Sequence, residues 1–206
     1  MRSLISITNY DDYALDIIGN NFTSNSGTKG IIYLDLLNKV PSAATGGRVL
    51  VASNTFTLNA GFFDSNVIFI RARGPTTGSI YSIIPSDGNV FCSGYRFDSN
   101  IFYQNFGCQG SAGGVIKFEC VDSGSNSSYG NDVYTYSTLG SVVGSEYYAI
   151  NFGAYTTSYT STTTYNGVSY TVDRNRNDFY GNNYTENYQT FSSGLITILG
   201  APRNFF

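Results

Sequence analysis

Four short segments of the chain alternate apolar and polar side chains with a period of two. They span residues 30–36, 66–72, 114–120 and 194–199. Because successive side chains of a strand point to opposite faces, one set in each segment faces a core. The inward sets are Ile32, Leu34 and Leu36; Ile68, Ile70 and Ala72; Ile116, Phe118 and Cys120; and Ile196 and Ile198. The outward residues include Asp35, Arg71, Lys117, Glu119 and Thr197, so the pattern predicts strands with one buried face.

Residues 3–7 have the same alternation and predict a further strand near the N-terminal end. No apolar pattern with a 3.6-residue period extends beyond two turns, and β-branched, aromatic and glycine residues dominate. The sequence therefore predicts an all-β chain.

A nine-residue unit recurs ahead of the four predicted strands, with the pattern apolar-x-x-Asn-x-aromatic-x-x-Asn. Its asparagine and aromatic positions are Asn20, Phe22 and Asn25; Asn54, Phe56 and Asn59; Asn100, Phe102 and Asn105; and Asn182, Tyr184 and Asn187. The apolar positions are Ile17, Val51, Phe97 and Phe179. The aromatic positions are 34, 46 and 82 residues apart. A constant unit at variable intervals predicts a regular frame with loops of different length, and the longest interval fits two coils, one of them degenerate near residues 150–152.

The repeat predicts a parallel β-helix of about four to five coils, in which stacked coils bury what a single coil cannot. The aromatic rings would stack, and the asparagines would form two amide ladders that donate and accept between coils. Asparagine also suits a turn because it tolerates a left-handed backbone. We expect one domain over residues 1–206, with 124–170 as a degenerate Tyr/Ser/Thr-rich coil with long loops. A sandwich of similar short strands is the alternative.

The Phe-x-x-Asn unit and the Gly-Gly-apolar strand start at residues 113–116 resemble the repeats of the polymorphic outer-membrane proteins. Those repeats belong to the wider pectin-lyase-like group of right-handed parallel β-helices. The resemblance covers about residues 12–200 and implies a right-handed helix. It leaves the function open, because such proteins include adhesins, surface proteins and inactive relatives of carbohydrate enzymes.

The composition removes several chemistries. The chain has 206 residues with only 12% charged, about half the usual share, and it contains no histidine. Without histidine, Ser-His-Asp and Cys-His nucleophiles cannot be built, and most zinc sites lose their commonest nitrogen ligand. A net charge of −3 argues against a nucleic-acid surface, and no apolar stretch approaches the ~20 residues of a membrane helix. We expect no cofactor, no nucleic acid and no membrane insertion.

Three cysteines, Cys92, Cys108 and Cys120, allow one disulfide with one thiol left over, or three buried thiols. Three N-glycosylation sequons begin at Asn21, Asn126 and Asn183. In the repeat, Asn21 and Asn183 take the same outward position on different coils, because the flanking asparagine and aromatic point inward. We hypothesise that both carry glycans.

Candidate catalytic and binding residues are few. Asp11, Asp12 and Asp16 form the only acidic cluster, which a carbohydrate enzyme or a calcium site could use, or which could simply be solvated. Arginines at i and i+2 in segments 71–73 and 174–176 could bind an anionic sugar or pair with nearby aspartates. Residues 129–170 contain nine tyrosines that could stack on sugars, form a protein interface or belong to an ordinary loop.

The coil ends complete the functional expectation. The first and last predicted strands have no recognisable capping helix, so their unpaired N–H and C=O groups invite another chain. We expect a non-enzymatic extracellular or cell-surface protein that docks end to end, with copies of itself or a neighbouring β-helix, into a filament, coat or appendage. The alternatives are an adhesin that binds glycans through the tyrosine-rich loops and, less favoured, a polysaccharide lyase or hydrolase.

Overall fold

The computed structural model describes residues 3–10, 14–37, 48–62, 67–74, 94–107, 114–122, 160–174, 177–189, 196–199 and 204–205. These residues form twenty β-strands and no helix. Eighteen strands make four sheets of parallel strands, and the remaining two form an antiparallel hairpin. The prediction of an all-β chain with parallel strands is confirmed.

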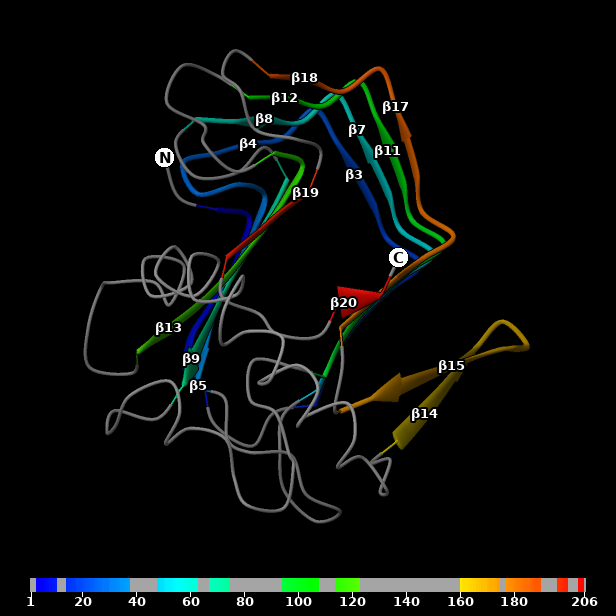
Figure 1. Ribbon diagram of the computed structural model, residues 1–206. Helices are drawn as coiled ribbons and strands as arrows, with labels where there is room; N and C mark the ends of the chain where they lie inside the picture. The colour runs from blue at the N-terminus through cyan, green and yellow to red at the C-terminus, as the bar shows by residue number, and fades with distance from the viewer. Residues whose placement is uncertain are drawn as a thin grey trace, which may run out of the picture.

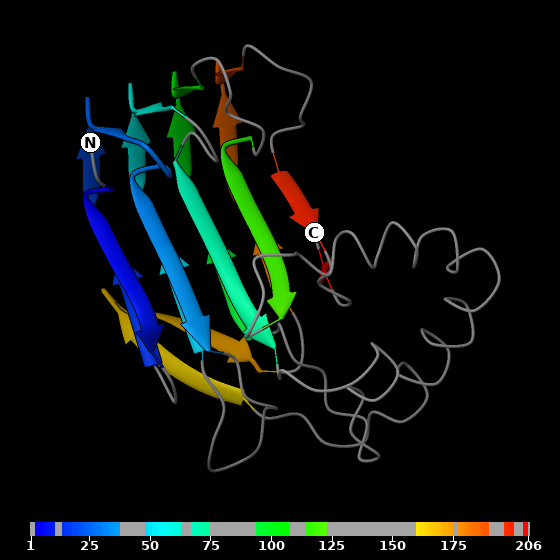
Figure 2. The same ribbon diagram turned by 90° about the vertical axis from the view of Figure 1, so that its left-hand side faces the viewer.

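Two five-stranded sheets contain the longer strands. Sheet A consists of β1 (Ile5–Tyr10), β5 (Ile32–Leu37), β9 (Ile68–Gly74), β13 (Ile116–Asp122) and β19 (Ile196–Leu199). Sheet B consists of β2 (Ala14–Ile18), β6 (Arg48–Ala52), β10 (Tyr95–Asp98), β16 (Asn177–Tyr180) and β20 (Asn204–Phe205). In both sheets the strands lie in chain order, as Figure 2 shows for sheet A.

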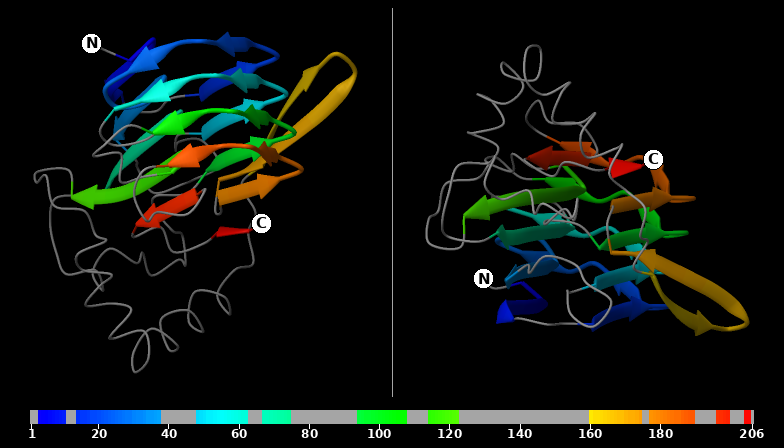
Figure 3. Two further views of the ribbon diagram at one scale, coloured as in Figure 1. Left: turned by 90° about the horizontal axis from the view of Figure 1, so that it is seen from above. Right: turned by 60° about the horizontal axis from the view of Figure 1, so that its bottom comes forward.

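Two four-stranded sheets contain the repeated unit. Sheet C consists of β3 (Asn21–Thr23), β7 (Thr55–Thr57), β11 (Ile101–Tyr103) and β17 (Asn183–Thr185). Sheet D consists of β4 (Ser26–Gly27), β8 (Ala60–Gly61), β12 (Phe106–Gly107) and β18 (Tyr188–Gln189). The chain therefore makes four passes through A, B, C and D in turn, followed by β19 and β20 (Figures 1 and 3).

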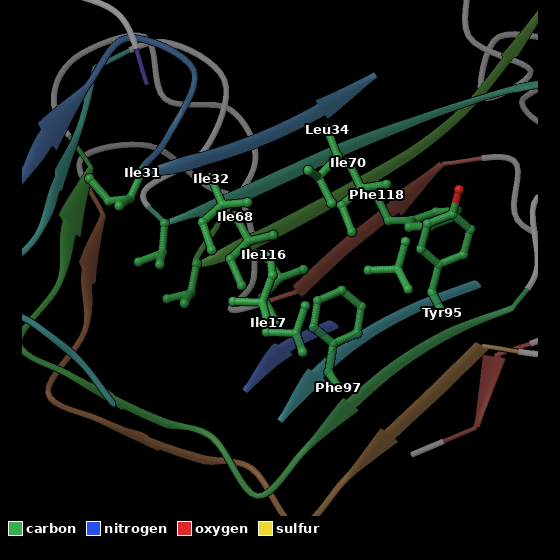
Figure 4. Close-up of a cluster of buried hydrophobic side chains, with 14 of the residues drawn as sticks. Ile17, Ile31, Ile32, Leu34, Ile68, Ile70, Tyr95, Phe97, Ile116 and Phe118 are labelled. Atoms are coloured by element: carbon green, nitrogen blue, oxygen red, sulfur yellow. The ribbon is translucent and has the colours of Figure 1, made fainter. Parts of the chain in front are cut away.

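The core lies between the sheets, and like side chains stack along it. Strand register places Ile5, Ile32, Ile68, Ile116 and Ile196 in one row of sheet A. Ile32, Ile68 and Ile116 are fully buried and point toward residues of sheet B such as Ile17 and Phe97 (Figure 4). All the predicted inward residues of β5 and β9 are in this core, together with Ile116 and Phe118 of β13.

The outward side of sheet A differs from the expectation of one buried face. Asp35, Lys117 and Glu119 are each at most 7% exposed, and the neighbouring Tyr33 and Phe69 are also buried. The middle of sheet A is thus buried on both faces, which is typical of parallel sheets. Alternation alone identified the inward set, but it overestimated the exposure of the opposite side.

The long interval between β11 and β17 holds no additional coil between these two strands. Phe102 of β11 pairs directly with Tyr184 of β17, and their ring centroids are 4.9 Å apart. One strand spacing is about 4.8 Å, so nothing fits between them. Within the expected degenerate coil, residues 160–173 instead form the antiparallel hairpin of β14 (Thr160–Tyr165) and β15 (Val168–Asp173). Residues 124–159 lie outside the described part.

Candidate functional site

Each asparagine of the repeat follows a residue with a left-handed backbone. These preceding residues have φ between 51° and 67° at Gly19, Ser53, Ser99 and Gly181, and between 51° and 57° at Ser24, Leu58, Gln104 and Glu186. The asparagines themselves do not have positive φ. The expectation that asparagine supplies the left-handed turn is therefore wrong. The turn belongs to the residue before it, and asparagine contributes its side chain.

The first asparagine row is a continuous amide ladder through four passes. The Asn20 side-chain nitrogen donates to Asn54 Oδ1 at 3.2 Å, Asn54 to Asn100 at 3.0 Å, and Asn100 to Asn182 at 2.8 Å. Each backbone N–H donates to the same oxygen, at 2.9, 3.0 and 3.1 Å in order. A second donation from the side chain reaches a backbone carbonyl, as from Asn100 to Val51 at 2.8 Å. Every inner amide is thus satisfied from both sides.

The second row repeats this arrangement one corner later. Asn25, Asn59, Asn105 and Asn187 are joined by side-chain hydrogen bonds of 3.1, 2.8 and 2.9 Å. Their backbone N–H groups bond the same oxygens at 3.0 Å. Asn59 and Asn105 are fully buried. Two ladders therefore flank sheet C, one at each of its corners.

The aromatic side chains of the unit stack between the two ladders. Phe22, Phe56, Phe102 and Tyr184 have successive ring centroids 4.8, 4.9 and 4.9 Å apart, with planes within 4°. Tyr184 differs from the phenylalanines because its buried hydroxyl has no hydrogen-bond partner among the residues that the structure describes. Burial raises the pKa of this hydroxyl.

The ladders are directional, so their two ends differ chemically. Each amide oxygen accepts from the preceding pass. At the β3–β4 edge, no donor in the described part of the chain reaches the side-chain oxygens of Asn20 and Asn25. At the β17–β18 edge, the backbone N–H groups of Asn182 and Asn187 have no acceptor among the described residues. One edge offers acceptors where the other offers donors.

The two sequons on sheet C have the same geometry. Register places Asn21 and Asn183 in one outward row, with Thr55 and Ile101 between them. Both asparagines are exposed, and each accepts a hydrogen bond of 2.8 Å from the threonine two residues later, Thr23 or Thr185. Asn126 lies outside the described residues.

Exposed aromatic residues gather around the corner between sheets C and D. Tyr103 of β11 is 36% exposed, Phe106 of β12 is 42% exposed, and Tyr188 of β18, the register partner of Phe106, is 61% exposed. Gln104 Nε2 donates to Glu186 Oε2 at 2.7 Å at the corner itself. The charge of Glu186 raises the pKa of the Tyr103 hydroxyl. The corner therefore combines apolar rings with a carboxylate and an amide.

The tyrosine-rich segment does not present its described tyrosines to solvent. Tyr170 is 3% exposed and packs with Val172 against Leu50 of sheet B. Its hydroxyl lies 2.7 Å from Ser53 Oγ. Tyr165 packs against the same cluster, close to Gly19. The expectation of an exposed tyrosine face is wrong for Tyr170, whereas Tyr165 is half-buried. The other seven tyrosines lie outside the described part.

The acidic cluster is represented by Asp16 alone, since Asp11 and Asp12 lie outside the described residues. Arg48 Nη2 donates to Asp16 Oδ2 at 2.9 Å, and Thr163 Oγ1 donates to the same oxygen at 3.1 Å. The Arg48 hydrogen bond lowers the pKa of Asp16. Asp16 thus joins the hairpin to sheet B.

Arg71 of the first arginine pair and Lys117 of sheet A also form internal contacts. Arg71 Nη2 and Lys117 Nζ lie 3.0 and 2.8 Å from the carboxylate of Glu119, and Tyr33 donates to Asp35 at 3.0 Å. The partner of Arg71 is therefore Glu119, which the sequence did not indicate. The side chains of Arg73 and Arg176 are outside the described part.

The metal and cysteine candidates lie only partly within the described residues. Among the described residues, no group of acidic or cysteine side chains could hold a metal ion. No helix of the described chain is long and apolar enough to cross a membrane. Cys120 lies in β13 beside Ala72 in register, whereas Cys92 and Cys108 fall outside the described ranges.

Comparisons with known proteins find no relative. No protein-family model matches the chain, and neither a curated protein nor a solved structure is significantly similar to it.

Proposed function

We propose that this chain is a right-handed parallel β-helix that serves as a non-enzymatic structural protein outside the cell or on its surface. Copies stack end to end into a filament, coat or appendage. The observation that carries this proposal is the complementarity of the two ladder ends: the acceptors of Asn20 and Asn25 and the donors of Asn182 and Asn187 have no partner among the described residues.

Physical chemistry favours filling these edges. An open strand edge offers a row of unpaired N–H and C=O groups to another chain. Stacking β3 of one copy on β17 of another would place Phe22 over Tyr184, continuing the aromatic stack, because these residues share one row of sheet C. Such a heterologous contact does not close on itself and so extends into a fibre.

A charge test at the junction can measure this stacking. Ser24 and Glu186 occupy the same corner of the first and last passes, and both are exposed. In the stack, Ser24 of one copy lies beside Glu186 of the next. Ser24→Glu should therefore weaken assembly, and Ser24→Lys should strengthen it, in negative-stain images and sedimentation velocity at low salt.

The two variants are matched, because both place a long side chain on the same left-handed residue. Adding Glu186→Lys to Ser24→Glu should restore assembly by reversing the charge pair. The proposal is overturned if the unmodified chain stays monomeric at high concentration, whereas equal assembly of the two Ser24 variants would show that β3 does not meet β17 at the junction.

A second candidate function is glycan binding, as an adhesin or carbohydrate-binding protein. The exposed rings of Tyr103, Phe106 and Tyr188 beside Glu186 and Gln104 favour it, since sugars stack on aromatic rings and bond to carboxylates and amides. Glycan-array binding should then fall on Phe106→Ala and Tyr188→Ala. Tyr180→Ala, which removes another exposed ring, is the control. Equal loss in all three variants would contradict the site.

An extracellular location implies that the sequons are available for modification. The matching exposed positions of Asn21 and Asn183 support glycans on both. Glycosidase treatment of the native protein should lower its mass, and the Asn21→Gln and Asn183→Gln variants should each lose one glycan. An unchanged native mass would contradict this part of the proposal.

A further inference from the structure

The described part of the four sheets does not contain equal numbers of strands. Sheets A and B have five strands each, whereas sheets C and D have four. The extra strands are β19 and β20, which pair with β13 and β16 and begin a fifth pass. Among the described strands, sheets A and B therefore extend one strand beyond sheets C and D at the β17–β18 edge, which forms a step.

This step determines how a second copy can dock. The first pass of the incoming copy consists of β1, β2, β3 and β4, one strand for each sheet. When its β3 and β4 pair with β17 and β18, its β1 and β2 fall on β13 and β16. Those positions are held by β19 and β20. Continuous ladders therefore require the displacement of β19 and β20.

The sequence of β1 matches the position that β19 occupies. Ile5 shares the inward row of Ile116 and Ile196, and Ile7 shares that of Phe118 and Ile198. The residues between are Ser6 in β1 and Thr197 in β19. Both strands thus have an isoleucine, a residue with a hydroxyl group and a second isoleucine at the same three register positions. The next register position lies beside Glu119, where β19 has Leu199 and β1 would have Thr8. A polar neighbour suits the carboxylate better, so this position favours β1.

Replacing β20 by β2 of the second copy lengthens the strand pairing with β16 in sheet B. β20 pairs with β16 through two residues, at Asn177 and Asp178. β2 has five residues and continues past this point, so its Ile17 would lie over Phe179 in the row that Val51 and Phe97 already share. The unfavourable contact is Asp16 beside Asp178, and Arg48 offsets the charge of Asp16 within its own copy.

We propose that β19 and β20 are a detachable cap on the C-terminal end, which the β1–β2 edge of a second copy replaces when copies stack. This inference rests on the proposed end-to-end assembly and specifies its junction. In the free molecule, the cap replaces the seven-residue edge of β13 and the four-residue edge of β16 with edges of four and two residues, and shorter edge strands limit unwanted pairing. In the assembly, sheets A, B, C and D all continue across the junction.

The axial repeat of the assembly tests the cap directly. With the cap displaced, each copy adds four strands to every sheet, which gives a repeat of about 19 Å at ~4.8 Å per strand. With the cap in place, copies meet through sheets A and B alone, and the repeat is about 24 Å. Layer lines or cryo-electron micrographs of the assembled full chain separate these values.

A matched pair of substitutions gives an independent test. Ile5 and Ile196 are both partly buried edge residues that pack against the same core. Ile196→Ser weakens the cap and should speed assembly several-fold, whereas Ile5→Ser weakens the incoming strand and should slow it by a similar factor. Circular dichroism of each variant monitors folding, and short wild-type assemblies serve as seeds.

The outcomes distinguish the cap from the proposed function. No assembly of the wild type overturns the end-to-end function itself. Assembly with a repeat near 24 Å, or with equal effects of the two serine variants, overturns the cap and leaves the function standing. A repeat near 19 Å with opposite effects of the variants supports both.

Discussion

Asn54 donates both its backbone N–H and its side-chain amide to the Oδ1 atom of Asn100, each at 3.0 Å, although 46 residues separate them. Asn100 is fully buried and also donates to Asn182 and Val51. Asn100→Ala leaves several buried groups unpaired and should lower the free energy of unfolding by about 3–4 kcal/mol. Urea denaturation measures this loss.

The matched control is Asn20→Ala at the exposed end of the same row. It removes only donations to Asn54 and Ile18, and Asn54 keeps the backbone bond from residue 20. A cost of about 1 kcal/mol or less is expected. Equal costs at the two positions would contradict the importance of the buried ladder.

Leu58 is a strained position on the surface. It has φ of 57° and is 45% exposed, so a branched apolar side chain occupies a left-handed corner without a core to cover it. Asparagine tolerates this backbone better, and Leu58→Asn should raise stability by about 1 kcal/mol. Leu58→Ala keeps the strain and should change stability little. Thermal unfolding compares the three proteins.

Tyr184→Phe should stabilise the chain, because it keeps the ring stack and removes a buried hydroxyl that has no partner in the described part of the chain. The expected gain is about 1 kcal/mol. Burial raises the pKa of Tyr184, so deprotonation of its hydroxyl favours the unfolded chain. The free energy of unfolding is therefore unaffected by this group below the unfolded pKa of about 10 and falls as the pH rises toward the folded value. Unfolding at alkaline pH should therefore begin at a higher pH in the variant, and a shift in the opposite direction would contradict the unpartnered state.

Gly19 allows the hairpin to approach sheet B. A Cβ atom at this residue would lie 2.1 Å from the Tyr165 hydroxyl, and its φ is 67°. Gly19→Ala should push Tyr165 outward and increase amide hydrogen exchange across residues 160–173. The same change should cost less in a Tyr165→Ala background, because the clash is then absent. Equal costs in both backgrounds would show that backbone strain alone is responsible.

Asp16 should make hairpin docking sensitive to acid. Its pKa is lowered by the Arg48 hydrogen bond, so its stabilisation is present above the ordinary value near 4 and is lost as the pH falls through the lowered value. An acid titration followed by hydrogen exchange of β14 and β15 should show this loss. In Asp16→Asn the dependence should be weaker, and an unchanged profile would assign it to another group.

The asparagine and aromatic rows were predictable because the same nine-residue unit recurs once in each pass of the chain. Strand register then brings the matching residues of successive passes together. The hairpin was missed, although Asn166-Gly167 between two alternating segments is a strong hairpin signal. The Arg71–Glu119 pair joins strands 48 residues apart in the chain, and the burial of Lys117 depends on what covers the outer face of sheet A. A single sequence specifies neither of these.

The ladder amides all point their oxygens toward the N-terminal end of the stack. Two parallel columns of such amides add their electric dipoles instead of cancelling them, unlike the alternating dipoles within a sheet. The molecule is consequently an electrically polar rod, with partial negative charge at the edge of Asn20 and Asn25 and partial positive charge at the edge of Asn182 and Asn187. Any fibre built from it has two unlike tips, one that presents amide oxygens and one that presents N–H donors.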